Sequence, residues 1–275
     1  MGLAVVKAHA YGNDFLMVAA RAVRTGAAAE GDPNALSQLA VLLCDRHRGI
    51  GADGLIVHEL QDGGARMTLL NADGSVAELS GNGVRCLAAL VAREHHLQKG
   101  AGVRITTDAG AKNLELLHIE RERYTFRAAL GPPEDVRQVA IRVGEESVFA
   151  TVLRVGNPQC VILGPLPDEE RFHRLGPALA AHSMFPAGTN VEFADVEAPD
   201  RVRILIWERG VGPTQSSGTG ACAAAVAAAA HGGASREVDV IAPGGTQRVE
   251  WRDDGVYLTG WAEIVFEGRF LGTIP

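Results

Sequence analysis

The alternation of apolar and polar positions near the start of the chain predicts short strands around one helix. Residues 4–18 contain two strands separated by a Gly-Asn turn, and 55–60 and 65–71 form a hairpin closed by the Asp-Gly-Gly turn at 62–64. In 35–46 the apolar residues recur at helical spacing, which indicates an amphipathic helix.

Two later segments are predicted to be buried helices, because they are apolar on most faces. Residues 81–94 are rich in alanine and are followed by expected strands at 103–107 and 113–119. Residues 220–231 are nearly all alanine. Small side chains let a curved sheet wrap closely around a helix, so we expect each helix at the centre of a sheet.

The two halves of the chain repeat each other. SGNGVRC at 80–86 matches SGTGACA at 217–223, an offset of 137 residues. The same offset places GADGLIV at 51–57 on GTNVEFA at 188–194 and Asn71 on Glu208. Slightly different offsets relate two more pairs of segments: AYGNDFLMV at 10–18 with RVGNPQCVI at 154–162, and VRITTDAG at 103–110 with VDVIAPGG at 238–245.

Five matches in the same order indicate a duplication. We therefore expect an α+β fold of two pseudo-symmetric lobes, each a mostly antiparallel sheet wrapped around a central helix. The first lobe is expected to span 1–120 and the second 121–263. Pro132-Pro133 is the expected linker near the junction.

Composition narrows the class of protein. The chain has 275 residues, of which 47% are apolar and 21% charged, the balance of a soluble globular protein. A net charge of −7 offers no electrostatic footprint for nucleic acid. The longest apolar stretch, 221–230, is shorter than the roughly 20 residues of a membrane span, and no signal peptide is visible. We expect a cytoplasmic enzyme with a small-molecule substrate and with neither a nucleic-acid nor a membrane partner.

The cysteines and lysines point away from a metal or a pyridoxal cofactor. Cysteines stand at 44, 86, 160 and 222, without metal-ligand spacing, so we expect buried free thiols. A pyridoxal enzyme needs a lysine for its Schiff base, and the three lysines lie outside Gly/Ser-rich phosphate settings. No cofactor and no metal are expected.

The glycine-rich turns SGNG and SGTG immediately precede the two central helices. Such a turn leaves backbone N–H groups at the positive end of the helix dipole, which favours an anion. One interpretation is that Ser80 and Ser217 are ordinary helix caps. The other is that both helix starts converge on one carboxylate in a cleft between the lobes, where the two side chains would flank the neighbouring carbon. That geometry suits moving a proton from one face of the carbon to the other.

Five segments resemble the diaminopimelate epimerase family over essentially the whole chain: HAYGNDF at 9–15, NADGSVAELSGNGVRC at 71–86, VGNPQC at 155–160, GTNVEF at 188–193 and WERGVGPTQSSGTGACAAAV at 207–226. The resemblance implies a cofactor-independent amino-acid epimerase, a homodimer of the bacterial cytoplasm that serves lysine and peptidoglycan synthesis. It further implies that the C-terminal segment 264–275 crosses back to join the first lobe.

The resemblance also assigns roles to residues. Positions that hold the reacting α-carboxylate are Gly81, Asn82, Gly218 and Thr219. Asn13 and Glu208 match positions close to the reacting amino group, and Glu208 is expected to assist the chemistry. Positions that grip the distal amino-acid end of the substrate are Asn71, Asn157, Asn190 and Arg209. A guanidinium suits a carboxylate there, and all four matches favour a substrate with an amino acid at both ends.

The chemistry positions depart from the family pattern. In the family, two cysteines act as acid and base, and in this chain Ser80 and Ser217 occupy their positions. Gln159 occupies the position of an assisting histidine. Cys86 and Cys222 lie too far into their helices to replace them. A hydroxyl is a weaker acid than a thiol by roughly five pKa units, or about 7 kcal/mol if uncompensated, so it needs an adjacent base. Glu208 is one candidate, whereas Glu78 is expected to be a solvated surface charge.

Three interpretations stay open at this point. The chain is a natural epimerase of LL-2,6-diaminopimelate in which the two serines relay protons with Glu208. Alternatively, it is an engineered Cys→Ser pair made to trap a complex, although Gln159 and the PTQSS flank serve no such purpose. In the third interpretation it is a relative with altered chemistry, such as a lyase, another racemase, or a binder of amino acids without turnover.

Overall fold

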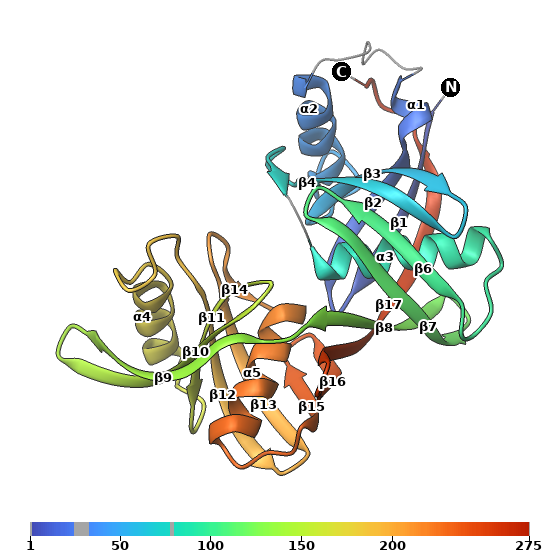
Figure 1. Ribbon diagram of the computed structural model, residues 1–275. Helices are drawn as coiled ribbons and strands as arrows, with labels where there is room; N and C mark the ends of the chain where they lie inside the picture. Colours follow the sequence, from blue (N-terminus) through green and yellow to red (C-terminus); the bar gives the residue numbers. More distant parts are fainter. Residues whose placement is uncertain (1, 25–32, 78–79, 275) are drawn as a thin grey trace. The chain divides into compact units, whose positions relative to one another are not determined.

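The computed structural model describes residues 2–24, 33–77 and 80–274. The chain divides into two compact units, one made of Met1–Ala128 with Gly260–Pro275 and the other of Ala129–Thr259 (Figure 1). The chain passes between the units inside two continuous strands. These positions, after Ala128 and after Thr259, lie near the expected 120 and 263 but do not coincide with them.

The sheet of the first unit is a closed ring of eight strands in the order β1–β2–β3–β4–β6–β7–β8–β17, where β17 pairs with β1 again. The strands are β1 (Leu3–Ala10), β2 (Asn13–Ala19), β3 (Gly54–Gln61), β4 (Gly64–Asn71), β6 (Gly102–Thr107), β7 (Gly110–Glu120), β8 (Arg123–Gly131) and β17 (Gly255–Phe270). The short β5 (Val76–Ala77) pairs with β4.

The helix α3 (Gly81–Glu94) fills this ring, and nearly all of its residues are buried (Figure 1). Its bounds are those predicted, and its Ala-rich sequence packs against apolar residues from the inner face of the strands. On the outer face, α1 (Ala20–Arg24) and α2 (Pro33–Cys44) cover a second apolar layer.

The second unit repeats this plan with its own sheet. Its strands are β9 (Glu134–Val143), β10 (Glu146–Val155), β11 (Asn157–Leu163), β12 (Asn190–Ala198), β13 (Arg201–Glu208), β14 (Gly212–Thr214), β15 (Glu237–Ala242) and β16 (Gly245–Arg252). The all-alanine stretch forms α5 (Gly218–His231) on one face, and α4 (Glu169–Ala180) packs on the other. Helix α5 begins two residues earlier than predicted, since Ser217 caps it.

Strand pairing relates the two units residue by residue. In the first unit β2–β3 is parallel, β3–β4 antiparallel and β4–β6 parallel, and β11–β12, β12–β13 and β13–β15 repeat that series. Met17 pairs with Ile56, and Val161 pairs with Glu192, so Ile56 and Glu192 occupy equivalent places. The predicted match of GADGLIV with GTNVEFA is therefore wrong by one residue, because it would place Leu55, which faces α2, on Glu192.

Two smaller predictions also need correction. The first hairpin turns at Tyr11 and Gly12, both with positive φ (56° and 88°), and Asn13 already belongs to β2. Pro132-Pro133 lies near the junction that follows Ala128, as expected, but it stands between β8 and β9 inside the second unit and is not a linker between the units. The fold as a whole is α+β and dominated by strands. Among the described residues, no helix combines the length and the apolar character needed to cross a membrane.

Candidate active site

Ser80 caps helix α3. Its backbone is extended (φ −132°, ψ 121°), and its Oγ accepts a hydrogen bond of 3.1 Å from Gly83 N. The first bond inside the helix follows at once, from Val84 N to Ser80 O (2.9 Å). The N–H groups of Gly81 and Asn82 therefore point out of the helix end, where the dipole favours an anion.

Ser217 caps helix α5 in the same way. Its backbone angles are φ −133° and ψ 126°, and its Oγ accepts a 3.1 Å hydrogen bond from Gly220 N. Ala221 N donates to Ser217 O at 3.0 Å. The cap interpretation is thus confirmed for both serines, and both caps leave a matching pair of outward amides, here those of Gly218 and Thr219.

Asn13, the first residue of β2, links that strand to the start of α3. Asn82 Nδ2 donates to Asn13 Oδ1 at 3.2 Å, and Arg85 in turn donates to Asn82 Oδ1. Asn13 Nδ2 donates to Asp53 Oδ2 at 2.7 Å. Two of the predicted site residues, Asn13 and Asn82, therefore lie together in the first unit.

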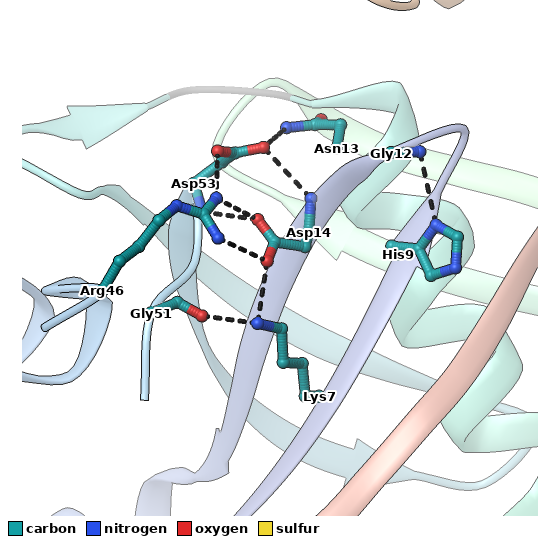
Figure 2. A network of polar contacts seen from close by, with 8 residues as sticks. All are labelled: Lys7, His9, Gly12, Asn13, Asp14, Arg46, Gly51 and Asp53. Atoms are coloured by element: carbon teal, nitrogen blue, oxygen red, sulfur yellow. Dashed lines mark hydrogen bonds and ion pairs between the residues drawn. The ribbon is translucent and has the colours of Figure 1, made fainter. Parts of the chain in front are cut away.

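An ion-pair network, which the sequence did not reveal, holds Asn13 in place (Figure 2). Asp14 pairs with Arg46 at 2.8 Å and with Lys7 at 2.9 Å, and Arg46 also pairs with Asp53 at 2.9 Å. Burial raises the pKa of Asp14, but the hydrogen bonds from Arg46 and Lys7 outweigh it and leave the pKa lowered. Asp14 is thereby held ionised, and its ion pairs hold Arg46 beside Asp53, the partner of Asn13.

Beneath the first turn of α3 the surroundings are apolar. A Cβ added to Gly83 would lie 3.4 Å from Ile56 Cδ1 and 3.6 Å from Phe15 Cε1, which is ordinary contact. Asn71, at the end of β4, donates instead to Ser75 Oγ at 2.9 Å within the following turn. Glu78 lies outside the described residues.

Beneath the first turn of α5 the surroundings are polar. Glu192 is fully buried and Gln159 is 1% exposed. A Cβ added to Gly220 would lie 2.6 Å from Glu192 Oε1 and 3.1 Å from Ser217 Oγ, so the acid and the hydroxyl lie close to the same point. The Gln159 amide contacts Glu192 Oε1 at 2.9 Å and Thr219 Oγ1 at 3.2 Å.

A second acid accompanies Glu192. Glu208 ends β13, and burial raises the pKa of its carboxyl. Burial also raises the pKa of Glu192, with the charge of Glu208 as the second cause. Two carboxyls that share a poorly solvated site resist double ionisation, so this unit can hold a proton near its helix start.

The residues expected to grip the distal end of a substrate are divided in the structure. Asn190 Oδ1 accepts from Arg209 N at 2.9 Å, while the Arg209 guanidinium donates to Ala187 O. Asn157 instead contacts the Gln159 amide. In this unit, Asn157, Gln159 and Thr219 form one group and Asn190 with Arg209 another.

The family model of diaminopimelate epimerase matches residues 5–135 and 151–265. The chain belongs to this family. It is 40% identical to the diaminopimelate epimerase of Desulforudis audaxviator over 96% of the chain and 98% of that protein.

Solved structures share the fold of this diaminopimelate epimerase family member at low sequence identity. A predicted epimerase from Pseudomonas aeruginosa superposes with a TM-score of 0.70 and 14% identity, over 98% of this chain and 99% of that one. A hydroxyproline epimerase from Agrobacterium vitis, with bound trans-4-hydroxy-L-proline, gives a TM-score of 0.67 and 16% identity, over 98% and 90%.

All four cysteines are buried, as predicted. Burial raises the pKa of the Cys86 thiol to about 12, and burial together with the charge of Glu192 raises that of Cys160. Neither thiol can supply the base of the family pattern. Among the described residues, no group of three His, Cys, Asp or Glu side chains is arranged to hold a metal ion.

Like the network around Asp14, Glu192 was missed by sequence reasoning. The signal was present in GTNVEF, where a carboxylate stands in a strand whose neighbours Val191 and Phe193 are core residues of the α4 face. Alternation places Glu192 with Ala194 on the α5 face, which is just as buried. A charge on such a strand implies either a partner or a raised pKa.

Proposed function

We propose that this chain epimerises LL-2,6-diaminopimelate to the meso form by two-base proton transfer at the α-carbon, a step of lysine and peptidoglycan synthesis. The observation that carries the proposal is that the two helix caps have the same geometry. Ser80 and Ser217 have matching backbone angles, the same 3.1 Å hydrogen bond and the same outward amides. Family membership supplies the substrate class.

In this proposal the two units are the two lobes of one site. Each helix start offers two amides to the α-carboxylate, from Gly81 and Asn82 on one side and from Gly218 and Thr219 on the other. Ser80 and Ser217 flank the α-carbon on opposite faces.

The rest of the substrate is held by side-chain amides, an acid and a guanidinium. Asn13 and Glu208 lie by the reacting amino group. The distal end is assigned to Asn71, Asn157, Asn190 and Arg209.

The proton transfer proceeds in two balanced halves. One serine, which has first lost its hydroxyl proton to solvent, takes the α-proton on its alkoxide oxygen as the Cα–H bond breaks, and the opposite hydroxyl gives its proton to the other face of the carbon and becomes an alkoxide. Solvent then restores both serines. The bonds from Gly83 N and Gly220 N stabilise a serine oxygen that carries negative charge. In the second unit, Glu208 is assigned to help move the proton of Ser217.

We further propose that the protein works as a homodimer in the cytoplasm, as the family usually does. Sedimentation equilibrium checks the oligomeric state. A monomer at micromolar concentration would contradict it.

The experiment is incubation with LL-2,6-diaminopimelate in deuterated water, with chirality and deuterium content of the α-carbons followed by chromatography and mass spectrometry. Inversion with deuterium entry supports the proposal. Release of ammonia or water would mean a lyase, and binding without exchange would mean a binder or a disabled enzyme. Either result would overturn it.

A further inference from the structure

Glu192 is a buried acid that the proposed proton transfer does not use. It is fully buried at the middle of the sheet, on the face that packs against α5. Its neighbours there are alanine and valine side chains of the α5 core. An ionised carboxylate is strongly disfavoured in such surroundings unless it is hydrogen-bonded.

The hydrogen-bonding partner of Glu192 is the side-chain amide of Gln159. That amide lies 2.9 Å from Glu192 Oε1 and 3.3 Å from Oε2 at one end. At its other end it meets Thr219 Oγ1 at 3.2 Å and the Asn157 side chain. Gln159 therefore bridges the buried acid to a hydroxyl at the helix start.

Two hydrogen-bonding arrangements fit these atom positions, and the proton on Glu192 decides between them. When Glu192 is ionised, Gln159 Nε2 must donate to it, and Gln159 Oε1 then accepts the hydroxyl proton of Thr219. When Glu192 is protonated, its O–H donates to Gln159 Oε1. Gln159 Nε2 then faces Thr219 and donates to Asn157 Oδ1.

The two arrangements differ in what the Thr219 hydroxyl offers to a bound anion, which is a hydrogen-bond donor in one and an acceptor in the other. With Glu192 protonated, Thr219 accepts from Gln159 and keeps its own O–H for the anion. With Glu192 ionised, the Thr219 proton is committed to Gln159, and oxygen lone pairs face the anion instead.

The groups that face Glu192 favour the protonated arrangement. From β13 comes Glu208, a like charge, and from β11 comes neutral Gln159. The Cys160 thiol of β11 lies on the α4 face, and the charge of Glu192 contributes to its raised pKa. Helix α5 carries no charged side chain from Ser217 to Ala230. The only part of α5 that favours an ionised Glu192 is therefore its positive amide end. Helix α4 packs on the other face of β12, against Val191 and Phe193.

We propose that Glu192, Gln159 and Thr219 form a hydrogen-bonded switch, in which protonated Glu192 turns the Gln159 amide so that the Thr219 hydroxyl donates to the substrate α-carboxylate. Glu192 acts through Gln159 and is a positioning residue. The inference rests on the proposed function only where Thr219 meets the substrate. Among the described residues of the first unit, Phe15 and Ile56 occupy the equivalent places, so no such switch forms there.

The binding test is titration calorimetry with LL-2,6-diaminopimelate over a pH series. The affinity of the unaltered protein should fall by up to about tenfold per pH unit once Glu192 ionises, because only the protonated form binds fully. Glu192→Gln keeps an N–H donor toward Gln159 and should remove that slope. Comparing the two proteins cancels the ionisation of the substrate itself. Thr219→Val should weaken binding and flatten the slope too, which keeps the test available if Glu192→Gln folds poorly.

The matched control is Glu197→Gln on the same strand. Glu197 forms surface ion pairs with Arg201 and Arg203, outside the site. The Glu197→Gln variant should keep the pH dependence of affinity that the unaltered protein shows. A slope that survives Glu192→Gln or Thr219→Val would overturn the switch.

A spectroscopic test needs no substrate and so separates this inference from the proposed function. Infrared spectra of the protein in deuterated buffer at neutral pH should show the C=O band of a buried, protonated carboxylic acid. Glu192→Gln should remove that band, while Glu208→Gln should leave a band from Glu192. Persistence of the full band in Glu192→Gln, or its absence in the unaltered protein, would overturn the proposal.

Discussion

The starts of helices α3 and α5 have the same caps but rest on different side chains. Ser80 and Ser217 cap their helices with the same hydrogen bond. Under α3 the neighbours of the first turn are Phe15 and Ile56, whereas under α5 an acid occupies the place of Ile56.

The difference shows which features the two helix starts share and which they do not. Cap geometry depends on a Ser-Gly-x-Gly segment and on backbone bonds, which both copies keep. The side chains beneath the cap depend on alternate strand positions, which can change without altering the fold. The first unit keeps the buried Asp14 and the exposed Asp53 in ion pairs with Arg46, and the second buries Glu192 without a cation beside it in those contacts.

The largest expected effect comes from removing either hydroxyl. Ser80→Ala and Ser217→Ala should each lower kcat/KM for epimerisation by about 10³-fold, since both faces of the carbon need a proton carrier. Each should also lose about 1 kcal/mol of stability with its cap. Asp168→Ala is the control, because it removes the cap of α4 with similar loss of stability and should leave the rate unchanged. A small effect of one serine alone would break the equivalence of the two helix starts.

Restoring thiols tests whether the hydroxyls limit the rate. Ser80→Cys combined with Ser217→Cys should raise α-proton exchange by about 100-fold, because a thiol at a helix start ionises far more readily than a hydroxyl. Deuterium exchange into substrate, followed by mass spectrometry, measures this. No gain would show that Gln159 or the pocket around it has adapted to serine.

A matched pair of glycines tests the side chains under the caps. Gly220→Ala would push a Cβ to 2.6 Å from Glu192 Oε1, so it should destabilise the protein by about 2 kcal/mol. Gly83→Ala meets nothing closer than 3.4 Å and should change stability by less than about 0.5 kcal/mol. Urea unfolding compares the two. Equal effects would contradict the difference described between the units.

The smallest expected effect is on the pH dependence of stability, with opposite signs in the two units. The raised pKa of Glu192 means that the folded protein binds its proton more tightly than the unfolded chain. Its contribution is therefore full below the unfolded pKa of about 4.5 and declines as pH rises, by at most about 1.4 kcal/mol per pH unit. The lowered pKa of Asp14 acts in reverse, so its contribution is lost as pH falls through the folded pKa.

Urea unfolding of Glu192→Gln and Asp14→Asn at several pH values separates the two contributions. The stability of Glu192→Gln relative to the unaltered protein should improve as pH rises. The stability cost of Asp14→Asn should shrink at low pH. Parallel curves for the two variants would show that the acids have the same environment.

Features set by local sequence were predicted well. The bounds of α3 follow from its apolar faces and from Ser80, and both caps follow from Ser-Gly turns before apolar runs. The start of α5 was placed late because the Gly-Thr-Gly segment has weak helix propensity, and the cap at Ser217 overrides it.

Features set by strand register were not predictable from local pattern. A single-residue difference between the repeats hid the equivalence of Ile56 and Glu192, since a shift of one residue exchanges the two faces of a strand. The role of Gln159 depends on Glu192 and stayed hidden with it. The network around Asp14 joins segments 30 to 40 residues apart, which no short motif contains.

The isotope content of product formed at early times tests the central claim most directly. With two carriers, meso product made from LL-2,6-diaminopimelate in deuterated water should hold one deuterium at the inverted carbon, and recovered substrate should hold none. Product that retains the original proton, or substrate that gains deuterium before product appears, would show that a single group serves both faces and would contradict the paired helix starts.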